Sequence, residues 1–227
     1  MRVSSLRRAS WCSSCVVFLI ACAAPAAGDD ETAAAPRSGS WTELFDGRAL
    51  GDFAPTAFGG EGEVRIEDGR IVLEQGGPLT GITWRGAALP TGDYEFELRA
   101  TRLAGNDFFC ALTLPVGSGH ASLVLGGWGG TLCGISSLDG LDASENETTR
   151  FLGFETGREY RVRVAVDAAR LRAWLDDEPI VDVPIAGRRV TVRPEVALSR
   201  PVGIAAFATR AAFRAIRWRP LARVNER

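Results

Sequence analysis

The most unusual stretch of the sequence places one tryptophan among four glycines, over 126–130. Glycine inside a strand loses backbone entropy and adds no packing, so this stretch predicts a loop. On such a loop Trp128 can hold its indole out as a flat platform for the C–H face of a sugar ring, because binding residues concentrate on loops. The alternative is that Trp128 folds back onto the core and the glycines allow a close approach.

A polar loop over 136–150 follows the tryptophan. Its short side chains can hydrogen-bond sugar hydroxyls, or hold a calcium ion through carboxylate and carbonyl oxygens. The candidates are Ser136, Asp142 and Asn146 for substrate binding, and Asp139 and Glu145 for catalysis. Their spacing differs from that of an EF-hand loop, so an ordinary solvated loop is the alternative to a calcium site.

His120 is the single histidine of the chain and the third candidate catalytic residue. An unperturbed imidazole exchanges protons near neutral pH, which suits a general base. The residue follows the glycine-containing stretch 116–119 and begins the apolar run 120–125, a position that favours an exposed side chain.

A second arrangement of acids alternates along 93–99, where Asp93, Glu95 and Glu97 share one face of a predicted strand. Neighbours on that face lie about 6.6 Å apart, within the range of carboxyl separations of inverting glycosidases. The opposite face carries three apolar residues that suit a core. The acids therefore face outward, where they are either catalytic or simply solvated.

The elements that position these residues are strands. Apolar and polar residues alternate strictly over 93–99 and 160–166, and Asp68-Gly69 is the turn pair of a hairpin over 63–73. Roughly a dozen short strands separated by Gly, Pro and Asp turns, with no sustained helical period, predict an all-β fold. We expect an antiparallel two-sheet jelly-roll sandwich over 41–222.

Composition agrees with a globular domain and narrows its partners. The 227 residues are 46% hydrophobic and 24% charged, which excludes a disordered tail. All 26 basic residues are arginine, and the formal net charge is −2. Such a balance gives no electrostatic reason to expect a nucleic-acid partner.

The first 21 residues predict a signal peptide of the lipoprotein type. A basic start precedes the apolar run 15–22, which is shorter than the roughly 20 residues that span a bilayer. Leu19-Ile-Ala-Cys22 resembles the bacterial lipobox, so Cys22 is the expected lipidation site and 22–40 a flexible tether. We expect an envelope lipoprotein held at the membrane by this anchor, in the periplasm or at the outer membrane. The alternative is cleavage after the small residues 23–27 and secretion.

Two cysteines remain in the predicted domain, Cys110 and Cys133, each in a strand-like stretch. In an oxidising compartment they form a disulfide if their Cα atoms lie within about 7 Å of each other. Two buried free thiols are the alternative. The scarcity of histidine and cysteine excludes a zinc site of the usual spacing.

Several segments resemble, in order, the 3-keto-disaccharide hydrolase domain family, formerly a domain of unknown function. The opening stretch Trp41-Thr-Glu-Leu-Phe-Asp-Gly-Arg-Ala-Leu50 is the most specific of them. Stretches 66–72, 92–98 and 171–175 and the closing Phe213-Arg-Ala-Ile-Arg-Trp218 follow, so that the resemblance covers nearly all of 41–221.

The resemblance implies a concanavalin-like jelly roll that binds a saccharide on its concave sheet face. It also implies hydrolysis or elimination of 3-keto-glycosides, with His120 or a loop carboxylate as the base. One family strand aligns loosely with 105–109, which adds Asp107 to the candidate binding residues, whereas a second family strand has no counterpart. That gap favours the alternative, a non-catalytic carbohydrate-binding or surface-interaction module.

Overall fold

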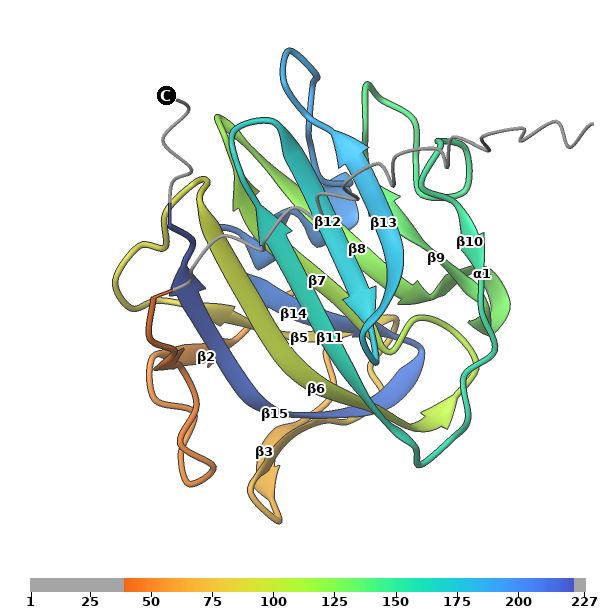
Figure 1. Ribbon diagram of the computed structural model, residues 1–227. Helices are drawn as coiled ribbons and strands as arrows, with labels where there is room; N and C mark the ends of the chain where they lie inside the picture. The colour runs from red at the N-terminus through yellow and green to blue at the C-terminus, as the bar shows by residue number, and fades with distance from the viewer. Residues whose placement is uncertain (1–38, 223–227) are drawn as a thin grey trace, which may run out of the picture. The chain divides into compact units, whose positions relative to one another are not determined.

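The structure, a computed structural model, describes residues 39–222. The predicted signal peptide, Cys22 and the tether up to residue 38 lie outside the described residues. Two antiparallel sheets pack face to face (Figure 1). This confirms the predicted all-β jelly-roll sandwich.

The sheet nearer the viewer in Figure 1 has eight strands. Their order is β13 (Glu178–Pro184), β12 (Arg170–Leu175), β11 (Glu159–Val166), β6 (Tyr94–Gly105), β15 (Thr209–Pro220), β4 (Arg70–Leu73) and β3 (Val64–Glu67), with β1 (Thr42–Glu43) paired to β15. The long strands β6 and β15 form its centre.

The other sheet has seven strands. Their order is β10 (Arg150–Phe151), β9 (Leu132–Ser136), β8 (Gly119–Gly126), β7 (Cys110–Val116), β14 (Gly203–Phe207), β5 (Leu79–Trp84) and β2 (Phe53–Pro55). β7, β8 and β9 are consecutive in the chain, whereas β14 inserts between β7 and β5.

Turn chemistry explains the hairpins. Asp68 and Gly69 take φ values of 51° and 71° between β3 and β4, as the predicted two-residue turn requires. Asp176 and Asp177 do the same, at 49° and 72°, between β12 and β13. Because two residues suffice there, β13 already begins at Glu178, and Pro179 belongs to the strand.

The apolar faces of the two sheets enclose the core. Tyr94, Phe96 and Leu98 of β6 are fully buried, as the alternation predicts. At one end of the core the rings of Phe109, Phe154 and Tyr160 pack edge to face, with Phe154 at 4.9 Å from Phe109 and 5.2 Å from Tyr160 between ring centroids.

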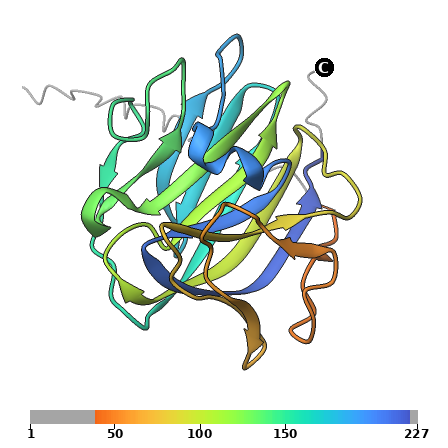
Figure 2. The same cartoon turned by 180° about the vertical axis from the view of Figure 1, so that it is seen from behind.

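A short 3₁₀ helix, η1 (Pro194–Ser199), lies across the outer face of the seven-stranded sheet, as Figure 2 shows. Its Val196 packs on Leu79, Ala111 and Ala205 in a small apolar cluster separate from the main core. The sheet can accept the helix because the side chains beneath it are small.

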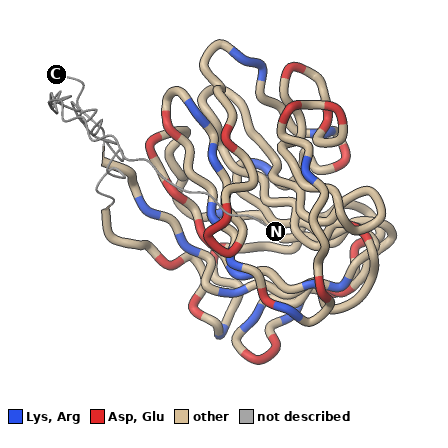
Figure 3. The backbone as a smooth tube through the Cα atoms, turned by 45° about the vertical axis from the view of Figure 1, so that its right-hand side comes forward, with Lys and Arg blue, Asp and Glu red and all other residues tan. Residues whose placement is uncertain are grey.

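The outer face of the eight-stranded sheet is instead covered by ion pairs, and Figure 3 shows basic and acidic positions next to each other on its strands. Glu97 accepts hydrogen bonds from Arg161 and Arg217 and is only 1% exposed. Glu95 is likewise held by Arg163 and Arg219.

These contacts decide the role of the alternating acids. Burial by itself raises the pKa of Glu97, but hydrogen bonds from Arg161 and Arg217 outweigh it and hold the pKa below its ordinary value. Glu97 is thus held in its ionised form, and both Glu95 and Glu97 are fully engaged by arginines, which is unsuited to a general acid or a nucleophile. The alternating pair is structural.

We expect Glu97→Gln to lower the free energy of unfolding by about 2–3 kcal/mol, because it leaves two arginines facing a neutral amide. Urea denaturation measures the change. Glu43→Gln is the matched control: Glu43 contacts the same Arg217 at 3.5 Å from an exposed position, so its loss costs below about 0.5 kcal/mol.

The same pair predicts a pH dependence. Since the folded-state pKa of Glu97 is depressed, its contribution is complete above the unfolded-state pKa and is lost as the pH falls through the folded-state pKa. Between neutral pH and about pH 3 the wild type should therefore lose more stability than Glu97→Gln. Equal losses in the two proteins would contradict the assignment.

Candidate functional site

A hollow of about 210 Å³ opens on the outer face of the seven-stranded sheet, between η1 and the turn α1 (Gly127–Gly130). Its apolar walls include Trp128, Phe108 and Phe207. Asp107, Ser122, Ser136, Arg193 and Glu195 add polar groups around them. A mainly apolar hollow with a few polar groups is the usual composition of a small-ligand site.

Trp128 stands out from the surface at this hollow. It takes a left-handed conformation, with φ 48° and ψ 52°, and Gly129 after it has φ 89°. The glycine tolerates this turn because it has no Cβ atom. The indole is 46% exposed. Of the two predicted orientations of Trp128, the structure shows the one in which the indole is held out at the surface and not folded back onto the core.

Two charged side chains hold the tryptophan turn. Asp107 accepts hydrogen bonds from the backbone N–H groups of Phe108 at 2.7 Å and Gly129 at 3.4 Å. From inside the sandwich, buried Arg102 donates to the carbonyl oxygens of Gly130 and Phe154. Asp107 therefore positions the platform as well as lining the hollow.

The floor of the hollow consists of small buried residues. Ser136 donates to a carboxylate oxygen of Asp142 at 2.6 Å, and the Ser122 and Thr113 hydroxyls lie 2.8 Å apart. Both serines are 1% exposed. Ser136 is thus at the predicted site, with its hydroxyl hydrogen already committed to Asp142.

Arg193 and Glu195 form the polar wall on the η1 side. Arg193 pairs with Asp142 and, at 3.0 Å, with Glu195. The hydrogen bond from Arg193 lowers the pKa of Glu195. Asp142 is consequently linked to the hollow through both Ser136 and Arg193, without lining it.

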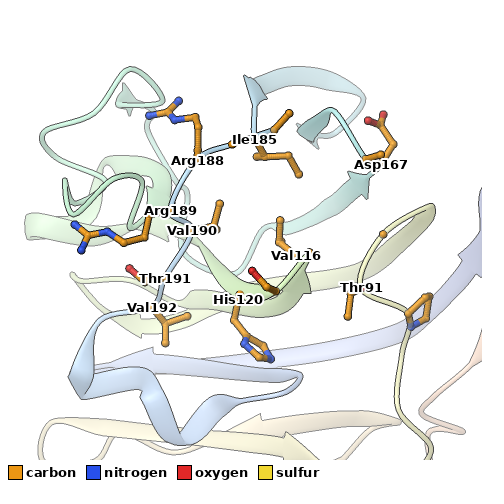
Figure 4. A pocket seen from close by; sticks show the side chains of 18 of the residues that line it. Thr91, Val116, His120, Asp167, Ile185, Arg188, Arg189, Val190, Thr191 and Val192 are labelled. Atoms are coloured by element: carbon orange, nitrogen blue, oxygen red, sulfur yellow. The ribbon is translucent and has the colours of Figure 1, made fainter.

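His120 lies in a different place. Its cleft, of about 1530 Å³, is at the end of the sandwich beside Thr91, Asp167 and Val190 (Figure 4). Ala197 of η1 lines this cleft, whereas Glu195 and Val196 of η1 line the tryptophan hollow, so the imidazole and the indole belong to separate cavities. Burial, followed by the nearby charge of Arg200, lowers the pKa of His120 below its usual value.

The other two candidate catalytic residues are engaged in the polar loop. Asp139 accepts a hydrogen bond from the backbone of Arg189 and a second from Arg188, and both lower its pKa. Glu145 caps its own loop at the backbone N–H of Asp142. The structure therefore does not bring the set His120, Asp139 and Glu145 together.

Asn146, expected at the sugar, instead holds the loop itself. Its side-chain amide donates to the carbonyl oxygens of Ile135 at 2.8 Å and Asp142 at 2.7 Å. Its side-chain oxygen accepts from the backbone and hydroxyl of Thr148. With 7% exposure and every group occupied, Asn146 is a structural residue.

The described residues do not fit the calcium alternative. Within 39–222 no group of three or more His, Cys, Asp or Glu side chains is placed to hold a metal ion. The loop carboxylates are instead paired with arginines. Arg188 forms ion pairs with Asp139 and Glu147, and Arg193 forms one with Asp142.

Cys110 and Cys133 are free and buried. Both pair with Leu125 of β8, one from each side, so that a whole strand lies between them. Two strand spacings are about 10 Å, beyond the reach of a disulfide. Of the two predicted alternatives, the structure shows two buried free thiols. Burial raises the pKa of the Cys133 thiol to about 11.

Sequence reasoning did not single out Phe108, Phe207, Arg193 or Glu195. A signal existed for Phe108: Phe109 follows it directly, and neighbours on a strand face opposite ways, so one of the two rings must lie outside. Arg193 and Glu195 carry no such signal, since only the chain path through η1 brings them to the hollow.

Solved structures share this architecture at low sequence identity. One is a Bacillus subtilis protein of unknown function with a galectin-like fold, with 11% identity, a TM-score of 0.56, and coverage of 83% of this chain and 99% of that one. This chain has a galectin-like jelly-roll fold. Among residues 39–222, no helix is long and apolar enough for a membrane span.

Two further neighbours were solved with sugars. The Crh5 transglycosylase in complex with NAG has 9% identity, a TM-score of 0.53, and coverage of 83% and 86%. Domain 4 of AbnA, an extracellular GH43 arabinanase from Geobacillus stearothermophilus, in complex with arabinotriose, has 13% identity, a TM-score of 0.51, and coverage of 83% and 94%. At such identities the likeness concerns the fold.

No family model and no curated protein matches the jelly-roll chain. The resemblance to the 3-keto-disaccharide hydrolase family therefore rests on the sequence motifs alone, while the jelly-roll scaffold that it implies is present.

The position of His120 predicts its titration. In an NMR titration the ring protons of the single histidine should report a pKa below 6.5, because burial and Arg200 both disfavour the charged imidazolium. Arg200→Gln should raise this pKa while leaving it below 6.5, since burial is the larger cause. A wild-type pKa at or above 6.5 would contradict the described environment.

Proposed function

We propose that this protein is a saccharide-binding module whose ligand stacks on Trp128 in the hollow between α1 and η1. The observation that carries the proposal is the exposed indole, on a turn whose backbone Asp107 and Arg102 bind, beside an apolar hollow with polar groups at its rim. The carbohydrate complexes of proteins with the same fold support it.

The polar groups at the rim suit hydroxyl recognition. Glu195 offers carboxylate oxygens as acceptors, and Arg193 offers N–H donors, while the two hold each other in place at 3.0 Å. Phe108 and Phe207, with ring centroids 5.5 Å apart, supply an apolar surface next to them. Charged donors and acceptors around a flat apolar wall match the polar edges and apolar faces of a sugar ring.

The same contacts favour binding without turnover. The two oxygens of Asp107 face backbone N–H groups, and Arg193 keeps the pKa of Glu195 low. Glu195 is therefore not poised to donate a proton, Asp107 is occupied by backbone groups, and His120 lines a separate cleft. Hydrolysis of 3-keto-glycosides, which the family resemblance implies, lacks a converging acid–base pair here.

We expect Trp128→Ala to weaken saccharide binding about tenfold or more, equivalent to about 1.4 kcal/mol, because stacking on the indole is lost. Isothermal titration calorimetry against arabino-, chito- and cello-oligosaccharides measures it. Trp174→Ala is the matched control, since Trp174 stacks under Arg163 on the other sheet. Stability should change by less than about 1 kcal/mol in Trp128→Ala.

Two outcomes would contradict this function. If Trp128→Ala binds saccharides with undiminished affinity, Trp128 is not the stacking platform. If the wild type binds no oligosaccharide of any series, the proposal of a saccharide ligand is contradicted. Incubation of the wild type with 3-keto-trehalose, with and without calcium, distinguishes binding from catalysis. We expect the substrate to remain intact, and its consumption would establish the hydrolase or lyase activity instead.

We further propose that the module works outside the cytoplasm, anchored at the bacterial envelope through Cys22. The basic start, the short apolar run and the lipobox-like Leu19–Cys22 support this. Cys22→Ser should move the full-length protein from the membrane fraction to the soluble fraction, and mass spectrometry should find lipid on the wild-type N-terminal peptide. A wild-type protein that is processed within 23–27 without lipid would support secretion.

A further inference from the structure

Phe151 is the most exposed large apolar side chain of the described residues, at 72%. It lies on β10, the two-residue edge strand of the seven-stranded sheet. Edge strands usually carry charged or small residues that discourage unwanted contacts, so a phenylalanine here suggests a ligand.

The pairing of the strands places Phe151 on the same face as the tryptophan hollow. Phe151 is directly opposite Leu132 of β9, and paired residues share a face. Cys133, the next residue after Leu132, points into the core. Leu132 and Phe151 therefore belong to the outer face, together with Ser136 of the floor.

The same row leads from Phe151 to Trp128. Leu132 also forms a bridge with Gly127, so 127, 132 and 151 lie side by side in three neighbouring backbone segments. Two strand spacings make the Cα atoms of Gly127 and Phe151 about 10 Å apart. Trp128 follows Gly127 directly, which puts two exposed aromatic side chains at one end of the sheet face.

Beyond the glycine the row continues into the hollow. A Cβ atom at Gly127 would lie 3.1 Å from Val124 and 3.9 Å from Phe108, so the buried Gly127 is closely flanked by both residues. Phe207 donates its backbone N–H to the carbonyl of Phe108 at 3.0 Å and continues the row. Phe207, Phe108, Trp128 and Phe151 thus lie along this end of the outer face, with the buried Leu132 between the last two.

We propose that this row is an extended binding surface for a linear oligosaccharide that runs across the strands, with Phe151 as an outer subsite. The inference rests on the proposed function and deepens it: the ligand is a chain of several linked rings rather than a free monosaccharide. One ring occupies the hollow at Trp128, and a later ring of the same chain stacks on Phe151.

η1 gives this surface its direction. Val196 fixes the helix on the sheet at the side of the hollow away from α1. η1 obstructs a ligand chain on that side of the hollow, whereas the exposed Trp128 and Phe151 lie on the side toward the edge strand. We therefore assign the open end of the site to Phe151.

Calorimetry with arabino-, chito- and cello-oligosaccharides, each from monosaccharide to hexasaccharide, tests the inference. In the wild type, affinity should rise with chain length and then level off. Phe151→Ala should lower the affinity for the longest bound ligand about tenfold, equivalent to about 1.4 kcal/mol, and leave the affinity for the shortest bound ligand unchanged. Phe151→Tyr should retain the length dependence.

Leu198→Ala is the control, because Leu198 is also an exposed apolar residue, at 55%, but lies on η1 outside the row. An unchanged length dependence in Phe151→Ala overturns the outer subsite and leaves the proposed function standing. If no series binds the wild type, the proposed function fails and this inference with it. Self-association that Phe151→Ala abolishes, measured by light scattering, would assign the side chain to a contact between copies instead.

Discussion

The site depends on the small side chains that cover the outer face of the seven-stranded sheet. Ala111 and Ala205 leave room for Val196, so η1 can lie directly on the strands and close one side of a hollow. On the opposite side Asp107 and Arg102 fix the turn that carries Trp128. Bulkier residues beneath η1 would lift the helix and spread the charged wall away from the indole.

The outer faces of the two sheets are covered by different kinds of side chain. The eight-stranded sheet covers its acids with arginines, some of which stack on tryptophan, as Arg163 does on Trp174 at 3.9 Å. On this face the carboxylates of Glu95 and Glu97 are already paired with arginines, which leaves them less free to bind a sugar. The seven-stranded sheet keeps small, apolar and aromatic side chains outside, and the proposed ligand surface lies on this face.

Local pattern predicted the scaffold because strand alternation and Asp-Gly turns act over a few residues. It also found Trp128, since four glycines around one aromatic residue are unusual wherever the chain leads. It failed for polar groups whose hydrogen-bond partners the pattern does not reveal. Asn146 resembles a sugar ligand in sequence, yet its amide satisfies carbonyl oxygens of its own loop. Asp139 is bound by the distant Arg188, and His120 lines a separate cleft.

By itself the sequence determined the two-sheet sandwich, its core-facing residues and the presence of an aromatic loop, because hydrophobic burial and turn geometry are read from neighbouring residues. Only the tertiary structure decided which polar side chains meet that loop. β14 and η1 come late in the chain, and they bring Phe207, Arg193 and Glu195 beside Phe108 and Trp128. Strand pairing also settled the cysteines, whose separation is set by a strand that lies between them.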